Sequence, residues 1–203
     1  SLFDYAKTVG YLVDNPMDRV VLPKYKVTQE EIELKREHYL SRQQIRLYLN
    51  ILDTEGKNPI FNILVEFLYL TGLRIGEAQA LMWSDIDFET KILTVRHTVQ
   101  RANKKSDYRI TTPKTIHSYR KVYFNSRVVE LLDELKCLTS VVSDKDLVFT
   151  NGRGDFFGLD AFNLYIQRYF DNQKIGKPDN FKLTSHVFRH SHVSLLAELG
   201  FHV

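Results

Sequence analysis

Cysteine is nearly absent from this sequence, in which Cys137 is the single thiol among 203 residues. One cysteine excludes an intramolecular disulfide framework, and such sparing use is typical of proteins from a reducing compartment. Because Cys137 lies among the apolar residues of a helical pattern, we expect it in the core. No apolar run approaches the ~20 residues that a membrane-spanning helix needs, and no signal-peptide pattern is present. We therefore expect a cytoplasmic protein with no membrane partner.

A large net charge is also lacking, since the whole chain carries only +3. The charge is nevertheless uneven, because residues 96–121 hold eight basic residues against the single acid Asp107, a net +7. The eight are Arg96, Arg101, Lys104, Lys105, Arg109, Lys114, Arg120 and Lys121. A solvated surface strip is the common explanation of such a run. A concentrated basic strip on a weakly charged protein is also typical of a polyanion-binding surface.

Hydrophobic periodicity predicts a mainly helical α+β protein with one small antiparallel sheet. A helix is expected to begin near Ser41, which has the capping-box spacing to Gln44, and Asn125 is placed to cap a later helix. The other predicted helices cover residues 60–70, 73–83, 126–138, 159–171 and 185–199. The predicted strands cover 91–99, 108–112, 118–124 and 147–150.

The stretch HVFRHSH, near the C-terminal end, holds three histidines and one arginine. His186 and Arg189 share one face of a helix that Thr184 or Ser185 can cap, and a helix start favours an anion. Arg74, in TGLRIGE, follows a glycine stop at a second predicted helix start. Two guanidinium groups placed in this way can bind the oxygens of one phosphate. They would also stabilise a phosphorane-like transition state, which carries more negative charge than the phosphodiester.

A metal site is the main alternative for these histidines. His186 and His190 have the i, i+4 spacing of zinc ligands on a helix. However, Val187 stands where a zinc protease has its glutamate, Arg189 would repel a dication, and no carboxylate lies nearby in sequence. We therefore predict no metal and no other cofactor, with His190 bracing the site. His186 can also be a packed, partly buried histidine.

Three segments of the chain resemble motifs of the tyrosine recombinases, also called phage-type integrases. YLTGLRIGEAQALMWSDID (69–87) is similar to the box around that family's first catalytic arginine. TPKT (112–115) resembles the loop of the catalytic lysine, and HVFRHSH resembles the His-x-x-Arg box. The motifs occur in the family's order, and the resemblance covers roughly residues 40–203. It implies the family's catalytic-domain fold with a small three-stranded antiparallel sheet.

The resemblance implies a role for each motif residue. Arg74 and Arg189 would clamp the scissile phosphate, while His186 would hydrogen-bond a phosphoryl oxygen and assist proton transfer. Lys114 would protonate the departing 5′ oxygen of the DNA strand, and Glu77 would hold the site in shape. The partner would be double-stranded DNA, contacted by Arg101, Lys104, Lys105, Arg109, Arg120 and Lys121.

Simpler structural roles compete with these assignments. Arg74 can instead form an ion pair with Glu77, one turn later on the same predicted helix. Lys114 can be a solvated turn residue, and Lys104 or Lys121 would then supply the acid. For the chain as a whole, the alternative function is a non-catalytic module that binds the DNA backbone.

The chain departs from the family pattern at its C-terminal end. Val203 lies fourteen residues beyond Arg189, before the place of the family's second His or Trp and of its nucleophilic tyrosine. Tyr165 and Tyr169 precede the His-x-x-Arg box and do not correspond to that nucleophile. We therefore expect a fragment that binds DNA without cleaving it.

The resemblance also predicts the organisation of the whole protein. Residues 1–24 would be the tail and linker of an upstream DNA-binding (core-binding) domain, and residues 25–203 an incomplete catalytic domain. The full-length protein would join DNA strands through a 3′-phosphotyrosine and assemble as a tetramer on DNA, at the nucleoid of a bacterial cell. The fragment alone would be a monomer.

Overall fold

The computed structural model of the chain describes residues 2–21, 38–101, 108–111, 119–139 and 143–201. Its contacts divide the chain into two units, Ser1–Glu37 and His38–Val203. The predicted boundary between residues 24 and 25 lies outside the described residues. Among the residues that are described, no helix is both long and apolar enough to cross a membrane.

The first unit contains a short α-helix, α1 (Leu2–Thr8), and a 3-10 helix, η1 (Pro16–Arg19). Asn15 caps η1, because its side-chain oxygen accepts the backbone N–H of Met17. Its amide nitrogen donates to Asp4 at 2.7 Å and so ties the two helices together. Neither helix buries an apolar side chain. The described part of this unit therefore has no hydrophobic core of its own.

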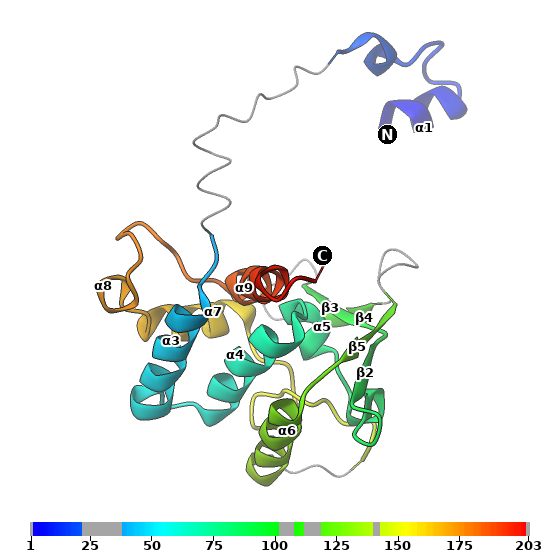
Figure 1. Cartoon of the computed structure of the whole chain (residues 1–203). Helices are drawn as coiled ribbons and strands as arrows, with labels where there is room; N and C mark the ends of the chain where they lie inside the picture. The colour runs from blue at the N-terminus through cyan, green and yellow to red at the C-terminus, as the bar shows by residue number, and fades with distance from the viewer. Residues whose placement is uncertain (1, 22–37, 102–107, 112–118, 140–142, 202–203) are drawn as a thin grey trace. The chain divides into compact units, whose positions relative to one another are not determined.

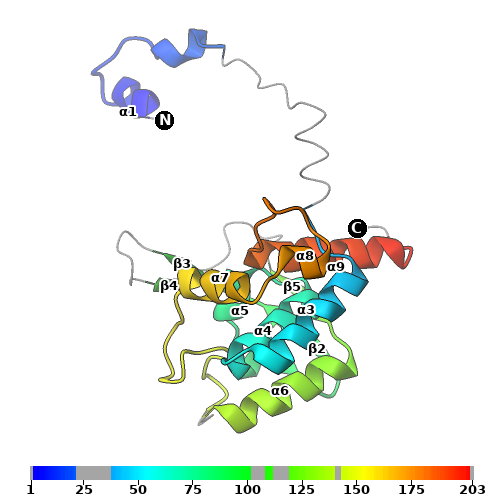
Figure 2. The ribbon, with the colours of Figure 1, turned by 90° about the vertical axis from the view of Figure 1, so that its left-hand side faces the viewer.

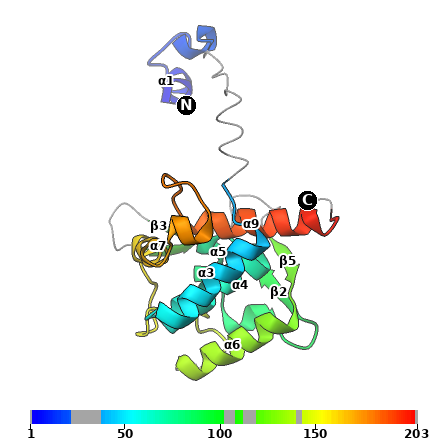
Figure 3. The ribbon, with the colours of Figure 1, turned by 60° about the vertical axis from the view of Figure 1, so that its left-hand side comes forward.

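Helices hold about half of the described residues of the second unit and far more than its strands, which confirms the predicted fold class. In its described part they are α3 (Arg42–Glu55), α4 (Pro59–Thr71), α5 (Ile75–Gln79), η2 (Trp83–Asp85), α6 (Ser126–Leu138), α7 (Leu159–Arg168), α8 (Asn172–Ile175) and α9 (Ser185–Glu198). α4 packs against both α9 and α6, and it lies between them in Figure 1, Figure 2 and Figure 3. The sequence of α4 explains this position, since an apolar residue on nearly every face suits a helix covered on several sides.

Side-chain caps define three helix starts, two of which were predicted. The Ser41 hydroxyl accepts the backbone N–H of Gln44, whose side chain accepts the Ser41 N–H, so the predicted capping box forms. Asn125 caps α6 as predicted, and Asn58 caps α4. These starts depend on residues only three positions apart, which is why the sequence reveals them.

The strands form two antiparallel sheets. One has the order β1-β2-β5, from Ile86–Asp87, Ile92–Val95 and Arg120–Tyr123. The other pairs β3 (Thr98–Arg101) with β4 (Tyr108–Thr111). The predicted single strand 91–99 is therefore divided, because its first half pairs with β5 and its last two residues pair with β4. Which strand becomes a partner depends on the path of the chain and not on local alternation.

Two predicted elements are shorter than expected because they pair with each other. The helix predicted for residues 73–83 ends at Gln79, and the strand predicted for 147–150 is reduced to one bridge between Met82 and Leu147. Backbone hydrogen bonds from Val148 to Leu81 (2.8 Å) and from Trp83 to Asp146 (3.1 Å) flank this bridge. The extended backbone of Met82, with φ of −105° and ψ of 155°, cannot continue the α-helix, and the chain resumes only as the short 3-10 helix η2 at Trp83.

Two further predictions were wrong in detail. The helix predicted for 159–171 stops at Arg168, and Asp171 instead caps the separate short helix α8. Cys137 is exposed and not in the core, although it lies in α6 as predicted. The buried face of α6 consists of Val128, Leu131, Leu132 and Leu135, and position 137 falls outside that helical stripe.

Aromatic packing holds α9 against the rest of the core. Tyr48 of α3 stacks on Phe188 of α9 at 6.2 Å and meets Phe170 edge-on at 5.5 Å between ring centroids. The Tyr48 hydroxyl donates to the carbonyl of Ile166 at 2.7 Å, so its burial leaves no unsatisfied donor. Burial raises the Tyr48 pKa far above its ordinary value. The direction of α9, and of its side chains, is thus set by the core.

Candidate active site

Arg74 lies at the junction between α4 and α5. Gly72 ends α4 in the left-handed conformation, with φ of 63°, and its N–H donates to the carbonyl of Leu68. Arg74 is the N-cap residue of α5, and its backbone N–H donates to Glu77 Oε2 at 2.9 Å. Its side chain is 52% exposed, so the guanidinium faces solvent at a helix start. The sequence predicted this position from the glycine stop.

Arg189 and His186 lie on the N-terminal half of α9. Neither Thr184 nor Ser185 caps this helix with its side chain as predicted; the backbone N–H of Ser185 instead donates to Asn163 of α7 at 3.0 Å. His186 is exposed, which excludes the packed-histidine alternative, and Arg189 is half-buried. A side chain from a neighbouring helix therefore replaces the expected local cap.

The two arginines of the predicted clamp meet at the α4–α5 junction. Arg189 Nη1 donates to the carbonyl of Gly72, two residues before Arg74. Burial lowers the pKa of Arg189, and the charges of Arg74 and Arg120 lower it further, against an opposing effect of Glu77. These effects indicate that the three guanidinium groups share one neighbourhood. With one carboxylate among them, the cluster carries a net charge of +2, which favours an anion.

Glu77 links two of the three arginines. Its Oε1 accepts from Arg74 Nη1 at 3.0 Å and from Arg120 Nη1 at 2.9 Å, and its Oε2 accepts from Arg120 Nη2 at 2.8 Å. The Glu77 side chain is only 5% exposed. Burial acts to raise its pKa, but the hydrogen bonds from Arg120 and Arg74 outweigh burial, so the pKa of Glu77 is lowered. The ion pair between Arg74 and Glu77 thus coexists with an exposed Arg74 guanidinium.

The Glu77 network makes a prediction for stability. We expect Glu77→Gln to lower the free energy of unfolding at pH 7 by about 2–3 kcal/mol, because two arginines lose a buried anionic partner. Since the folded-state pKa is below the ordinary value of 4.5, this stabilisation is complete above that value and is lost as the pH falls below it, through the folded-state pKa. Urea unfolding of both proteins from pH 7 to pH 3 measures it.

Glu66→Gln is the matched control for this prediction, because Glu66 also makes a two-pronged pair, with Arg127, but at a more exposed site. We expect it to cost less than about 1 kcal/mol. Two outcomes would contradict a stabilising Glu77 carboxylate. One is an equal loss of unfolding free energy in the two variants, and the other is a loss in Glu77→Gln that does not become smaller at acid pH.

The other two histidines of HVFRHSH have different surroundings. His192 Nδ1 lies 2.8 Å from the carbonyl of Tyr69, and its ring fills the space beside Gly72. His190 is exposed, and its pKa is lowered first by burial and then by His186, His38 and Arg189. Among the described residues, no three His, Cys, Asp or Glu side chains converge as a metal ion would require.

The residues predicted to contact DNA do not share one setting. Arg120 belongs to the Glu77 network, while Lys121 is exposed on the same strand, β5. Arg109 is exposed on β4. Arg101 ends β3, and nothing further is described of its side chain. Lys104, Lys105 and Lys114 lie outside the described residues.

A cleft opens beside the arginine cluster. Its volume is about 640 Å³, and Gly72, Arg120 and Arg189 are among the residues that line it. Lys121 and Tyr123 of β5 and the apolar Leu195 and Leu196 of α9 line it as well. Arg120 and Arg189 are therefore accessible from a groove between β5 and α9, while the exposed Arg74 is not among the residues that line it.

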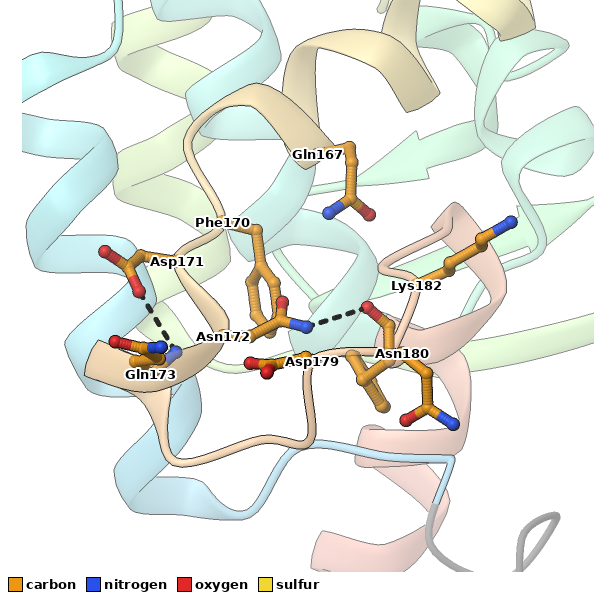
Figure 4. Close-up of a pocket in the computed structure, with 9 residues that line it drawn as sticks. Gln167, Phe170, Asp171, Asn172, Gln173, Asp179, Asn180 and Lys182 are labelled. Atoms are coloured by element: carbon orange, nitrogen blue, oxygen red, sulfur yellow. Dashed lines mark hydrogen bonds between the residues drawn. The ribbon is translucent and has the colours of Figure 1, made fainter.

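A second hollow, of about 670 Å³, lies between α7, α8 and the segment before α9 (Figure 4). Two of the polar side chains that line it hydrogen-bond the backbone of the surrounding loop. Gln167 Oε1 accepts the backbone N–H of Leu183 at 2.8 Å, and the Asn172 amide donates to the carbonyls of Pro178 (2.6 Å) and Phe181 (3.2 Å). We interpret these hydrogen bonds as the structural support that positions the segment leading into α9.

The chain belongs to the phage integrase family, whose sequence profile matches residues 38–203. The matched range coincides with the second structural unit and contains all three motifs. Membership in this family confirms the resemblance that the sequence motifs suggested.

Two relatives illustrate the similarity. The chain is 32% identical to the Prophage ps2 probable integrase of Lactococcus lactis subsp. lactis (strain IL1403), over 97% of this chain and 53% of that protein. It is 30% identical to the integrase of Staphylococcus phage L54a, over 96% of this chain and 58% of that protein. The chain thus spans little more than half the length of these relatives.

Solved structures share the fold at low sequence identity. The Tn1549 transposon integrase in complex with a circular intermediate DNA has a TM-score of 0.70 at 20% identity, covering 98% of this chain and 64% of that one. A lambda integrase dimer bound to a COC′ core site has a TM-score of 0.58 at 17% identity, covering 97% and 63%. The described helices and sheets therefore have the architecture of this recombinase group.

Two features of the site were not predicted from the sequence. Arg120 was expected only as one of several basic-strip residues and not as a partner of Glu77. The packing of His192 on Gly72 was also unexpected, although His192 and Arg189 are three apart and so share a helix face. That spacing was the available signal for His192; for Arg120 the sequence carries none.

Proposed function

We propose that this chain carries the phosphate-binding part of a site-specific DNA recombinase active site of the tyrosine-recombinase type. The supporting observation is that Arg74 and Arg189, more than one hundred residues apart in sequence, meet at the junction of α4 and α5. Family membership supplies the reaction class, and the net positive cluster supplies the reason for a phosphodiester substrate.

The two arginines would bind the non-bridging oxygens of the scissile phosphate. Each guanidinium can donate two parallel hydrogen bonds, and the phosphorane-like transition state carries more negative charge than the diester. The cluster therefore stabilises the transition state more than the ground state, which is the condition for catalysis. His186, exposed near the start of α9, would hydrogen-bond a phosphoryl oxygen and assist proton transfer.

The proposed reaction balances without a metal or ATP. A tyrosine oxygen outside these 203 residues attacks phosphorus and passes its proton to His186, and a 3′-phosphotyrosine bond forms. The bond from phosphorus to the 5′ oxygen breaks, and Lys114 donates a proton to that oxygen. Tyr165 is a poor nucleophile, because its hydroxyl lies 2.6 Å from Asn62 Oδ1 and burial raises its pKa. The assignment of Lys114 depends on the TPKT motif alone.

The organisation of the whole protein is part of the proposal. The unburied apolar side chains of α1 and η1 support residues 1–24 as part of an upstream DNA-binding domain, with residues 25–203 as the catalytic domain. The full-length protein would assemble as a tetramer on double-stranded DNA, while the fragment would remain a monomer. Sedimentation of each, with and without DNA, tests these states.

DNA binding by the fragment should depend strongly on salt. If the chain makes about 3–5 phosphate contacts, its affinity for duplex DNA should fall roughly 40- to 500-fold between 50 and 200 mM salt, because bound counterions are released. Fluorescence anisotropy with two unrelated duplexes measures both the slope and the small sequence preference. Lys121→Met should reduce the slope by about one. Binding that does not change with salt would exclude a phosphate-dominated interface.

The decisive experiment uses the full-length protein with nicked suicide DNA, in which the cleaved end diffuses away and traps the covalent intermediate. A protein–DNA adduct joined through a tyrosine downstream of residue 203 is the expected result. A protein that binds the duplex with steep salt dependence and never forms an adduct would instead be the non-catalytic DNA-backbone module.

A further inference from the structure

The carboxylate of Glu77 has no unused hydrogen-bonding capacity toward its neighbours. Each oxygen accepts two hydrogen bonds: Oε1 from the guanidinium groups of Arg74 and Arg120, and Oε2 from Arg120 and the Arg74 backbone N–H. Four bonds is the number that a carboxylate can accept. Arg120 provides two of them as a two-pronged pair, and Arg74 provides only one from its side chain.

Arg120 is held more rigidly than Arg74. It lies on β5 opposite Val95 of β2, and Val95 is buried. Its side chain is 28% exposed, against 52% for Arg74. Arg120 therefore approaches Glu77 from the sheet side of the network, and Arg74 lies on the side open to solvent. A side chain fixed by a sheet is a more precise support than one on a loop.

The pairing of Arg120 with Glu77 determines which hydrogen-bond donors of Arg74 remain available. Among the described contacts, the Arg74 guanidinium reaches Glu77 through Nη1 only, which leaves its other donors toward solvent. Without Arg120, Glu77 would be a buried carboxylate with two vacated acceptor positions. Arg74 is the nearest cation able to fill both, because the two residues are one helical turn apart. A guanidinium engaged in this way would turn toward Glu77 the donors that now face solvent.

We propose that Arg120 is a positioning residue of the phosphate clamp, which occupies Glu77 so that Arg74 stays available to the scissile phosphate. This inference rests on the proposed function and replaces the earlier assignment of Arg120 as one of several DNA contacts. Arg120 also contributes positive charge to the cluster, since it acts on the pKa of Arg189. A positioning role and a purely electrostatic role of Arg120 predict different results for a variant that keeps the positive charge but cannot make the two-pronged contact.

Arg120→Lys in the full-length protein makes that separation. We expect its single-turnover rate of adduct formation on saturating nicked suicide DNA to fall roughly 10- to 100-fold, as expected for a misplaced catalytic group. Its DNA affinity should remain within about threefold of wild type. Arg127→Lys is the matched control, because Arg127 makes the same kind of pair with Glu66 between α6 and α4, and it should react at the wild-type rate.

A second variant tests the mechanism of positioning. In Arg120→Gln/Glu77→Gln no buried carboxylate remains to draw in Arg74, so the adduct rate should recover about tenfold relative to Arg120→Gln alone. Removing both charges together is also better tolerated than removing one. If the single variants do not fold, the double variant decides: a rate within about tenfold of wild type supports positioning, and a rate as low as that of Arg74→Lys overturns it.

The outcomes separate this inference from the function on which it rests. An Arg120→Lys rate equal to wild type overturns positioning and leaves the recombinase function intact. A normal rate at saturating DNA with weakened affinity also overturns it, in favour of a direct DNA contact. No adduct from the wild-type protein overturns the proposed function and this inference with it.

Discussion

Arg189→Lys should abolish formation of the covalent protein–DNA adduct by the full-length protein. Arg189 is held by its Nη1 contact to the Gly72 carbonyl and by the packing of α9, so its guanidinium has one orientation toward the cleft. Lysine keeps the charge but offers a single point donor, which cannot make the two-pronged contact to a phosphate. Losing one such transition-state donor costs on the order of 10²–10³ in rate, and Arg74→Lys should behave alike.

Three measurements make this prediction specific. The adduct is followed on nicked suicide DNA, DNA affinity by anisotropy at fixed salt, and folding by thermal denaturation. We expect affinity within about threefold of wild type and only a small loss of stability, of about 1 kcal/mol for the lost hydrogen bond. Arg127→Lys again serves as a control outside the site. Efficient adduct formation by Arg189→Lys or Arg74→Lys would remove that residue from the clamp.

Gly72→Ala should be among the most destabilising single changes at this site. Gly72 has a φ of 63°, and a Cβ placed there would lie 2.4 Å from Cδ2 of His192. The positive φ costs about 1 kcal/mol and the overpacking about 1–3 kcal/mol, together roughly 2–4 kcal/mol. His192 has little freedom to move, because its Nδ1 is paired with the Tyr69 carbonyl. Chemical denaturation measures the loss.

Gly152→Ala is the matched control for this clash. Gly152 also has a positive φ, of 75°, but no atom lies within 4 Å of the position of its Cβ. It should cost only about 1 kcal/mol. The double variant Gly72→Ala/His192→Ala should be more stable than the sum of its two single losses, since removing the imidazole makes room for the methyl group. Equal losses at positions 72 and 152 would show that His192 does not confine Gly72.

Gly72 also affects the geometry of the candidate site, and not only the stability of the fold. The carbonyl of Gly72 accepts from Arg189, and its backbone leads directly to Arg74. A shift of a few tenths of an ångström at this residue therefore moves both guanidinium groups relative to each other. TGLR is thus a structural joint as well as the location of Arg74, the arginine that we propose for the phosphate clamp.

Features that depend on residues a few positions apart were predictable. The capping box at Ser41 and Gln44, the buried helix α4 and the cap at Asn125 all follow from local patterns. The positions of Arg74 and Arg189 at or near helix starts were predictable for the same reason. Local periodicity and capping chemistry act within one or two turns, and a sequence displays them directly.

Features that depend on distant partners were not predictable in this way. The strand predicted for 91–99 divides between two sheets, and the helix predicted for 73–83 is cut short by pairing with residues 146–148. Nothing near Glu77 in the sequence indicates that Arg120 is its partner, or that Asn163 would take the place of a local cap on α9. In each case a long-range contact overrides the local preference.

The amino-acid sequence by itself determined the chemical groups of this protein, the class of its fold and the family to which it belongs. The tertiary structure alone decided that Arg74, Arg120 and Arg189 gather around one buried carboxylate, and that Gly72 and His192 form the joint beneath them. The physical reason is that side-chain identity and helical period are local properties. Which charges come within a few ångströms of each other depends instead on how the whole core packs.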